Sequence, residues 1–249
     1  MKKYKIVVVF LFIILCGCQN NSNPNETQKQ TTCLSTAQQI TSETYENFLY
    51  EEQEKGIRII QYDGNETLVK VPETIDGKNV TIIGKEAYYQ QSNIETVILP
   101  QGLKVIEDSA FYRCYSLKNI AIPKQVKEIG DNPFYRCSAL SFIQVDEENQ
   151  WFSQVDGILF DKKQTRLYAY PEAKSSTEYI VPSSVKTIED SAFGYHSNLK
   201  SITILSSVTQ MPKGNIFAYP WEMTFVVEAG SVAEEYAKEY GLNYQLIKE

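Results

Sequence analysis

Side chains that could act as a catalytic nucleophile, base or metal ligand are few in this chain of 249 residues. His196 is the only histidine, so a Ser-His or Cys-His nucleophilic centre would depend on it alone, and no Gly-x-Ser-x-Gly segment accompanies it. A zinc site with two histidines is excluded for the same reason. No phosphate-binding loop, dinucleotide motif or Cys-x-x-Cys pair is present. The sequence therefore predicts a protein without enzymatic activity, metal site or cofactor, in which His196 packs or faces solvent.

Acidic and thiol side chains recur at a fixed interval. Asp108 and Asp131 are 23 residues apart, and so are Cys114 and Cys137. A glycosidase would need two facing carboxylates, but an Asp that returns once per repeat at a turn is better explained as an acceptor for backbone N–H groups. The two cysteines would stand about 5 Å apart on neighbouring coils, so a disulfide and a buried column of free thiols are both open. We favour the free thiols, because a repeat position that accepts Cys is usually a packing position.

Cys18 is the one side chain whose surroundings indicate a specific modification. The chain opens with a basic segment, residues 1–5, followed by the apolar run 6–15. This order is typical of an export signal, and the run is shorter than the about 20 apolar residues that span a bilayer. The segment Leu15-Cys16-Gly17-Cys18 resembles a bacterial lipobox, which implies cleavage before Cys18 and attachment of a diacylglycerol to its thiol. An ordinary secretory signal with an incidental Cys is the alternative.

The N-terminal segments predict a domain organisation and a location. Residues 1–17 are a lipoprotein signal peptide, residues 18–43 are a polar, disordered tether of roughly 25–30 Å, and residues 44–249 are the folded domain. The net charge is −7 and no basic run occurs, so nucleic acid is excluded as a partner. We expect a domain held by its lipid anchor at the extracytoplasmic face of a bacterial cell membrane.

The folded part carries a hydrophobic pattern with the same 23-residue period. Ile83, Ile106 and Ile129 mark successive repeats, and an aromatic residue follows each of them after five residues. A period of roughly 20–29 residues is typical of a leucine-rich solenoid, in which each coil buries its apolar side against the next. The pattern returns after residue 185, and the predicted core includes Tyr88, Phe111, Phe134, Leu117, Leu140, Ile120, Ile143, Ile188, Phe193, Leu199 and Ile202.

Each coil is predicted to hold one short strand, and these strands should stack in parallel. In residues 117–122 apolar and polar residues alternate with a period of two, and Pro123 ends the strand because proline has no N–H to donate. At the entrance to the solenoid, Asp63-Gly64 lies between the apolar runs 57–62 and 68–71. This arrangement predicts a hairpin that covers the first coil.

Two further elements follow the third repeat. The interval from Ile129 to Ile188 is 36 residues longer than one period, and Asp156-Gly157 between apolar runs predicts a hairpin inserted there. Near the end of the chain, Ser231 and Glu234 form a capping box. It predicts a helix that Gly241 stops, followed by a last strand at residues 244–247 that closes the far edge.

These segments resemble a known repeat family. Residues 106–123 are similar to the BspA-type leucine-rich repeat, as are residues 188–202, 62–80, 156–160 and 230–237. The resemblance implies an α/β solenoid with short parallel strands, exported to a cell surface and without catalytic residues; some relatives bind host matrix proteins or other cells. Pro133 departs from the pattern at the position of Ala110, and segment 209–228 is irregular.

The predicted function is the binding of a protein or glycan ligand, with host matrix proteins among the candidates. A structural or assembly lipoprotein of the bacterial envelope is the alternative. If the strands stack in register, their outward side chains form one uncharged face that suits a flat protein partner. The predicted face comprises Thr96, Ile98, Asn119, Ala121, Phe142, Gln144, Ser201 and Thr203. The alternative contact is the inserted hairpin, through Tyr168 and Tyr170.

Overall fold

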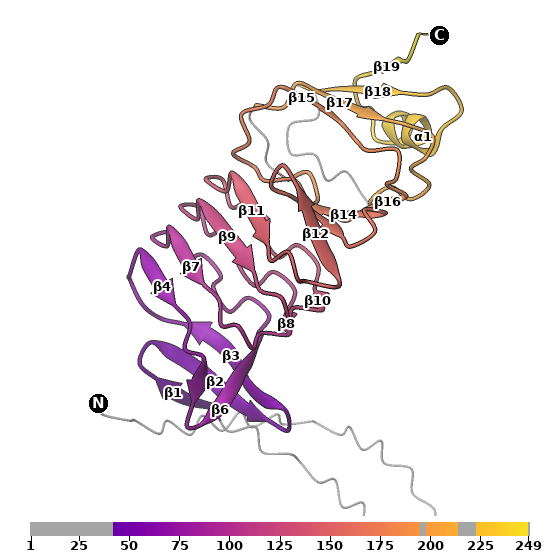
Figure 1. Cartoon of the computed structure of the whole chain (residues 1–249). Coiled ribbons are helices and arrows are strands. Elements are labelled where there is room, and N and C mark those ends of the chain that lie inside the picture. Colours follow the sequence, from indigo (N-terminus) through magenta and orange to yellow (C-terminus); the bar gives the residue numbers. More distant parts are fainter. Residues whose placement is uncertain (1–41, 195–197, 214–222, 249) are drawn as a thin grey trace, which may run out of the picture.

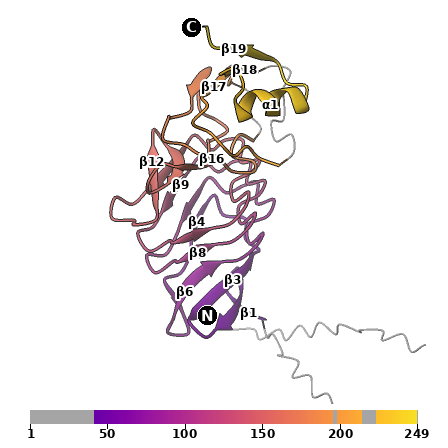
Figure 2. The ribbon, with the colours of Figure 1, turned by 90° about the vertical axis from the view of Figure 1, so that its right-hand side faces the viewer.

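The computed structural model of the protein describes residues 42–194, 198–213 and 223–248. They form an elongated stack of coils, with antiparallel strands at the N-terminal end and a helix, α1 (Val232–Glu239), at the other end (Figure 1). In the orthogonal view the coils rise one above another between these two ends (Figure 2). Within the described ranges no helix is long and apolar enough to cross a membrane. The predicted solenoid with parallel strands and a C-terminal helix is confirmed.

The N-terminal end is covered by hairpins. Its strands are β1 (Ser42–Tyr45), β2 (Phe48–Gln53), β3 (Gly56–Tyr62), β5 (Thr74–Ile75) and β6 (Lys78–Ile83). The first three pair in antiparallel order, β6 pairs in parallel with β3, and β5 folds back on β6. Asp76 and Gly77 join β5 to β6 with φ values of 50° and 77°, and positive φ at both central residues is what a type I′ hairpin turn requires.

The hairpin predicted at Asp63-Gly64 is wrong. β3 pairs with β2 and β6, whereas β4 (Leu68–Lys70) pairs with β7 (Thr96–Ile98) in a different sheet. The segment instead connects the two sheets within the first coil. Tyr62, which precedes it, stacks on Tyr88 of the next coil, with ring centroids 5.5 Å apart. The solenoid therefore begins one coil earlier than the 23-residue pattern indicates.

Two narrow parallel sheets run along the stack. One has the order β11-β9-β7-β4 and includes β9 (Asn119–Ile122) and β11 (Phe142–Val145). The other continues from β6 through β8 (Val105–Ile106) to β10 (Glu128–Ile129). Exposed and buried side chains alternate along β9 and β11, which confirms the predicted strands of period two.

The aromatic residue of each repeat lies in the core between these sheets. Tyr88, Phe111 and Phe134 stack with ring centroids 4.9 and 5.7 Å apart, and all three are buried. Cys114 and Cys137 form a second buried column as free thiols. Their Sγ atoms donate to carbonyl oxygens of the preceding coil at 3.1 Å, and burial raises the pKa of the Cys137 thiol. The prediction of a packed column of free thiols is confirmed.

The predicted insertion is present and has three antiparallel strands. They are β12 (Phe152–Val155), β13 (Ile158–Asp161) and β14 (Arg166–Ala169). β14 pairs in parallel with β16 (Thr187–Ile188), and Tyr170 stacks on Phe193 with centroids 5.3 Å apart. The end of the insertion therefore already belongs to the next coil of the solenoid.

The insertion also divides the hydrophobic core in two. Along β13, Leu159 belongs to the cluster of the N-terminal coils, whereas Ile158 and Phe160 belong to the cluster of the C-terminal coils. A strand that is buried on both faces acts as a partition. The coil on each side of the insertion thus buries its apolar side against the insertion rather than against another repeat.

The far end of the solenoid is a parallel sheet covered by α1. Its strands, in spatial order, are β15 (Glu178–Ile180), β17 (Ser201–Ile204), β18 (Thr224–Val227) and β19 (Tyr244–Leu246). The side chain of Ser231 accepts a hydrogen bond from Glu234 N at 3.2 Å, and the Glu234 carboxylate accepts one from Gly230 N at 2.7 Å. Gly241, with a φ of 63°, follows the helix. The predicted cap, helix and last strand are confirmed.

Candidate binding surfaces

The outward side chains of β4, β7, β9 and β11 form one continuous surface, here called the sheet face. Two rows of residues cross the strands in register. The first row is Leu68, Thr96, Asn119 and Phe142. In the second row Lys70 pairs with Ile98, and Ala121 pairs with Gln144. Leu68, Ile98 and Phe142 are 57, 45 and 39 % exposed, so the sheet face presents large apolar side chains on strands whose backbones are fixed by the ladder.

Most residues predicted for the binding face lie on the sheet face, but Ser201 and Thr203 do not. They lie on β17, which pairs with β15 and β18 in a separate sheet, and both are half-buried. The reason is the insertion: Ile143 N of β11 donates to Gly157 O at 3.0 Å. Because the free edge of β11 meets the insertion, the face cannot continue to β15.

Leu68 and Lys70 belong to the sheet face although the sequence pattern did not predict them. They precede Thr96 and Ile98 by 28 residues instead of 23, so the period misses them. The alternation around Val69, which resembles that around Val97, is the signal that could have found them.

A glycine supports Phe142 at the end of the sheet face. A Cβ atom on Gly157 would come within 2.5 Å of the Phe142 ring, and the φ of Gly157 is 75°. Glycine is therefore required here both by the backbone conformation and by the close approach of the ring. One side of the Phe142 ring therefore packs against the insertion at Gly157, while the ring remains partly exposed.

The alternative contact through the inserted hairpin does not fit the structure. Tyr170 is buried, and Tyr168 is half-buried, with its ring edge-on to Phe152 at 5.3 Å between centroids. Both tyrosines serve the packing of the insertion between the coils.

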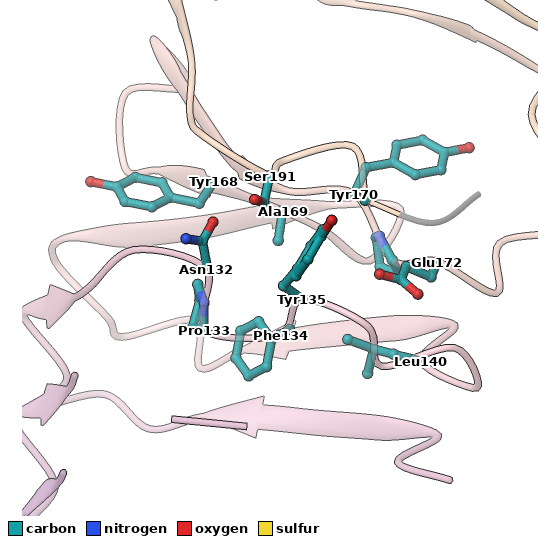
Figure 3. Close-up of a pocket in the computed structure, with 12 residues that line it drawn as sticks. Asn132, Pro133, Phe134, Tyr135, Leu140, Tyr168, Ala169, Tyr170, Glu172 and Ser191 are labelled. Atoms are coloured by element: carbon teal, nitrogen blue, oxygen red, sulfur yellow. The ribbon is translucent and has the colours of Figure 1, made fainter. Parts of the chain in front are cut away.

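A small cavity of about 20 Å³ lies at the seam between the insertion and the coil before it. Figure 3 shows that Asn132, Tyr135 and Leu140 come from one side of this seam and Tyr170 and Glu172 from the other. The Glu172 carboxylate accepts a hydrogen bond from Arg136 N at 2.8 Å. A volume of this size holds about one water molecule, so the cavity has no room for an organic substrate.

The backbone role predicted for the repeated acids is confirmed for Asp108, and Asp190 has the same role. Asp108 Oδ1 accepts a hydrogen bond from Asp131 N at 3.0 Å, and Asp190 Oδ1 accepts one from Lys213 N at 2.9 Å. Each carboxylate thus ties its own coil to the turn of the next coil. No group of three or more His, Cys, Asp or Glu side chains that could hold a metal ion occurs in the part of the chain that the structure describes. Cys18 and His196 lie outside the described residues.

Comparisons with known proteins agree with the repeat pattern. The family model "BspA type Leucine rich repeat region" matches six copies over residues 68–156 and 163–224. None of the curated proteins matches the chain.

Three solved structures illustrate the resemblance. A leucine-rich cell surface protein from Faecalibacterium prausnitzii is 18% identical, with 76% of this chain and 76% of that chain covered and a TM-score of 0.48. A leucine-rich repeat protein from Eubacterium ventriosum is 22% identical, with 75% of this chain and 65% of that chain covered and a TM-score of 0.48. The leucine-rich repeat protein of T. pallidum is 18% identical, with 81% of this chain and 97% of that chain covered and a TM-score of 0.39.

The family model matches more than half of the chain, in the coils whose aromatic column and parallel strands the structure shows. The chain belongs to the BspA-type leucine-rich repeat family.

Proposed function

We propose that the protein is a lipid-anchored binding module of the bacterial cell surface that recognises a protein ligand through the sheet face. The observation that carries this proposal is the exposure of Leu68, Ile98 and Phe142 on one rigid sheet. Leu68 and Ile98 lie on adjacent strands and Phe142 lies two strands further along, and an exposed apolar surface of this kind is typical of interaction sites. The export signal and lipobox pattern of residues 1–18 support the location.

The composition of the sheet face favours a protein partner. Its two rows contain a single charged side chain, Lys70, so it offers little to a polyanion, which requires clustered cations. Large apolar residues separated by small or amide side chains such as Asn119 and Ala121 resemble the core and rim of a protein interface. An extended surface on stacked repeats is also where solenoids commonly bind.

The first experiment is a pull-down with the full chain as bait. Host matrix proteins form one set of candidate ligands, and envelope proteins of the producing bacterium form the other. Capture from the first set supports a host-binding module, whereas capture from the second set alone supports a structural lipoprotein of the envelope.

The sheet face is tested by the double substitution Ile98→Glu and Phe142→Glu. We expect the affinity for the captured ligand to fall at least about tenfold, since a hot-spot residue near the centre of an interface costs about 2 kcal/mol or more when it is removed. Ile180→Glu is the matched control, because Ile180 pairs with Thr203 at the same repeat position in the other sheet and is 66% exposed. Surface plasmon resonance measures affinity and circular dichroism confirms folding. Unchanged affinity in a folded double variant would place the ligand elsewhere.

The anchor is tested by metabolic labelling with a fatty acid analogue. We expect label on the wild-type chain and none on Cys18→Ala, because the thiol of Cys18 is the predicted attachment site. Two acyl chains hold a protein stably at a membrane, so Cys18→Ala should also appear in the medium. Cys33→Ala, which changes a cysteine of the tether, should keep its label. Equal labelling of Cys18→Ala and the wild type would place the lipid on another residue, and a wild-type chain without label would leave only an ordinary secretory signal.

A further inference from the structure

A shallow depression of about 490 Å³ lies where the chain turns from one parallel sheet to the other. Three successive coils contribute to it, and its side chains combine ammonium, amide and indole groups. They include Lys104, Lys124, Lys127, Glu148, Gln150 and Trp151, and we call this surface the Trp151 strip. It shares no residue with the sheet face, so a ligand of the strip is independent of the proposed protein ligand.

The Trp151 strip is locally basic although the whole chain carries a net charge of −7. Lys124 pairs with Glu148 at 3.2 Å. Lys104 and Lys127 occupy the same position in adjacent coils, where Lys127 N donates to Lys104 O at 2.9 Å. Neither of these two has an ion-pair partner among the residues that the structure describes. Like charges on adjacent coils repel each other, and an anion between them would offset that repulsion.

Trp151 is held at the end of this strip by a buried amide. Asn149 takes the core position that Val126 fills one coil earlier, and it is fully buried. Its Nδ2 donates to Pro123 O and Val126 O at 2.9 Å, and its Oδ1 accepts from Trp151 N and Phe152 N at 2.8 Å. These four bonds satisfy the amide completely. They fix the backbone of Trp151, which nevertheless remains 46% exposed.

We propose that the Trp151 strip binds an acidic polysaccharide. An exposed indole on a backbone that Asn149 holds in place offers a platform on which the apolar face of a pyranose ring can stack. Carboxylate or sulfate groups of the same saccharide pair with Lys104 and Lys127, and the amide of Gln150 bonds to ring hydroxyls. Because successive coils are about 4.8 Å apart, a linear saccharide that lies along the stack meets one cation on each of two coils. A phospholipid surface also attracts lysine and tryptophan, but it contacts protruding groups, whereas these line a depression.

Calorimetric titration of the full chain with four probes tests the proposal. Heparin oligosaccharides carry sulfates, hyaluronan oligosaccharides carry carboxylates alone, dextran is neutral, and phosphatidylglycerol vesicles present an anionic membrane. We expect binding to heparin, to hyaluronan or to both, which identifies the acidic group, and weaker binding at high ionic strength because the contacts are exposed. Equal binding to dextran, or binding to the vesicles alone, would overturn the proposal.

Variants then locate the site. The double substitution Lys104→Gln and Lys127→Gln should weaken saccharide binding about tenfold, and Trp151→Ala should do so by a similar factor. Lys186→Gln is the matched control, because Lys186 has the same place before its strand β16 but does not line the depression. Ile98→Glu with Phe142→Glu should leave saccharide binding unchanged, which separates this site from the sheet face. Full affinity in the folded double lysine variant would contradict the assignment, as would an equal loss in Lys186→Gln.

Discussion

Phe111→Ala is expected to lower the free energy of unfolding by about 3–5 kcal/mol, the usual loss for a fully buried phenylalanine. Phe111 stacks between Tyr88 and Phe134, with ring centroids 4.9 and 5.7 Å away, and it is completely buried. The substitution would therefore remove the middle ring of the column and leave a cavity that two neighbouring coils share.

The position of the damage is as informative as its size. In a solenoid each coil contacts mainly its neighbours, so hydrogen exchange should accelerate first in residues 80–145. Denaturant unfolding measures the loss of stability. Tyr115→Ala is the control from the same coil, because Tyr115 is 41% exposed and its loss should cost within about 0.5 kcal/mol. Unchanged exchange across residues 80–145 in Phe111→Ala would contradict a core role for the ring.

Asn149→Ala is expected to destabilise the protein by about 2–4 kcal/mol. The substitution deletes the amide and with it four hydrogen bonds of 2.8–2.9 Å, and buried backbone groups left without partners are costly. Asn149→Leu tests whether the lost hydrogen bonds cause the destabilisation. Leucine is apolar, like Val126 at the same position one coil earlier, but its side chain accepts no hydrogen bond. We expect this variant to stay destabilised, since the N–H groups of Trp151 and Phe152 still lose their acceptor.

Thermal unfolding followed by circular dichroism checks this expectation. Gln150→Ala is the control, since Gln150 is an exposed neighbour whose amide donates only to Glu148 O. Wild-type stability in Asn149→Leu would show that the position requires only apolar packing.

The sequence alone determined the architecture of the repeats. Ile83, Ile106 and Ile129 with their following aromatics predict a stacked core, and the structure contains that core. Local pattern suffices here because each coil meets a nearly identical neighbour: the same residue types come into contact wherever the period is kept. The helix cap at Ser231 was predictable because a capping box lies within a few adjacent residues. The free thiols were predictable because Cys114 and Cys137 occupy the same packing position in successive repeats.

Which strands share a sheet was decided only by the tertiary structure. Asp63-Gly64 has the composition of a hairpin turn, yet β3 and β4 pair with strands of different sheets, and Tyr62 stacks on Tyr88 of the next coil. Ser201 and Thr203 occupy the expected repeat positions but lie outside the sheet face, since Gly157 O accepts a hydrogen bond from β11 at the edge where the next strand would pair. The Trp151 strip has no local signature either, because its lysines and its indole come from three coils. A period states what recurs along the chain, whereas hydrogen-bond partners and surfaces depend on which segments meet in space.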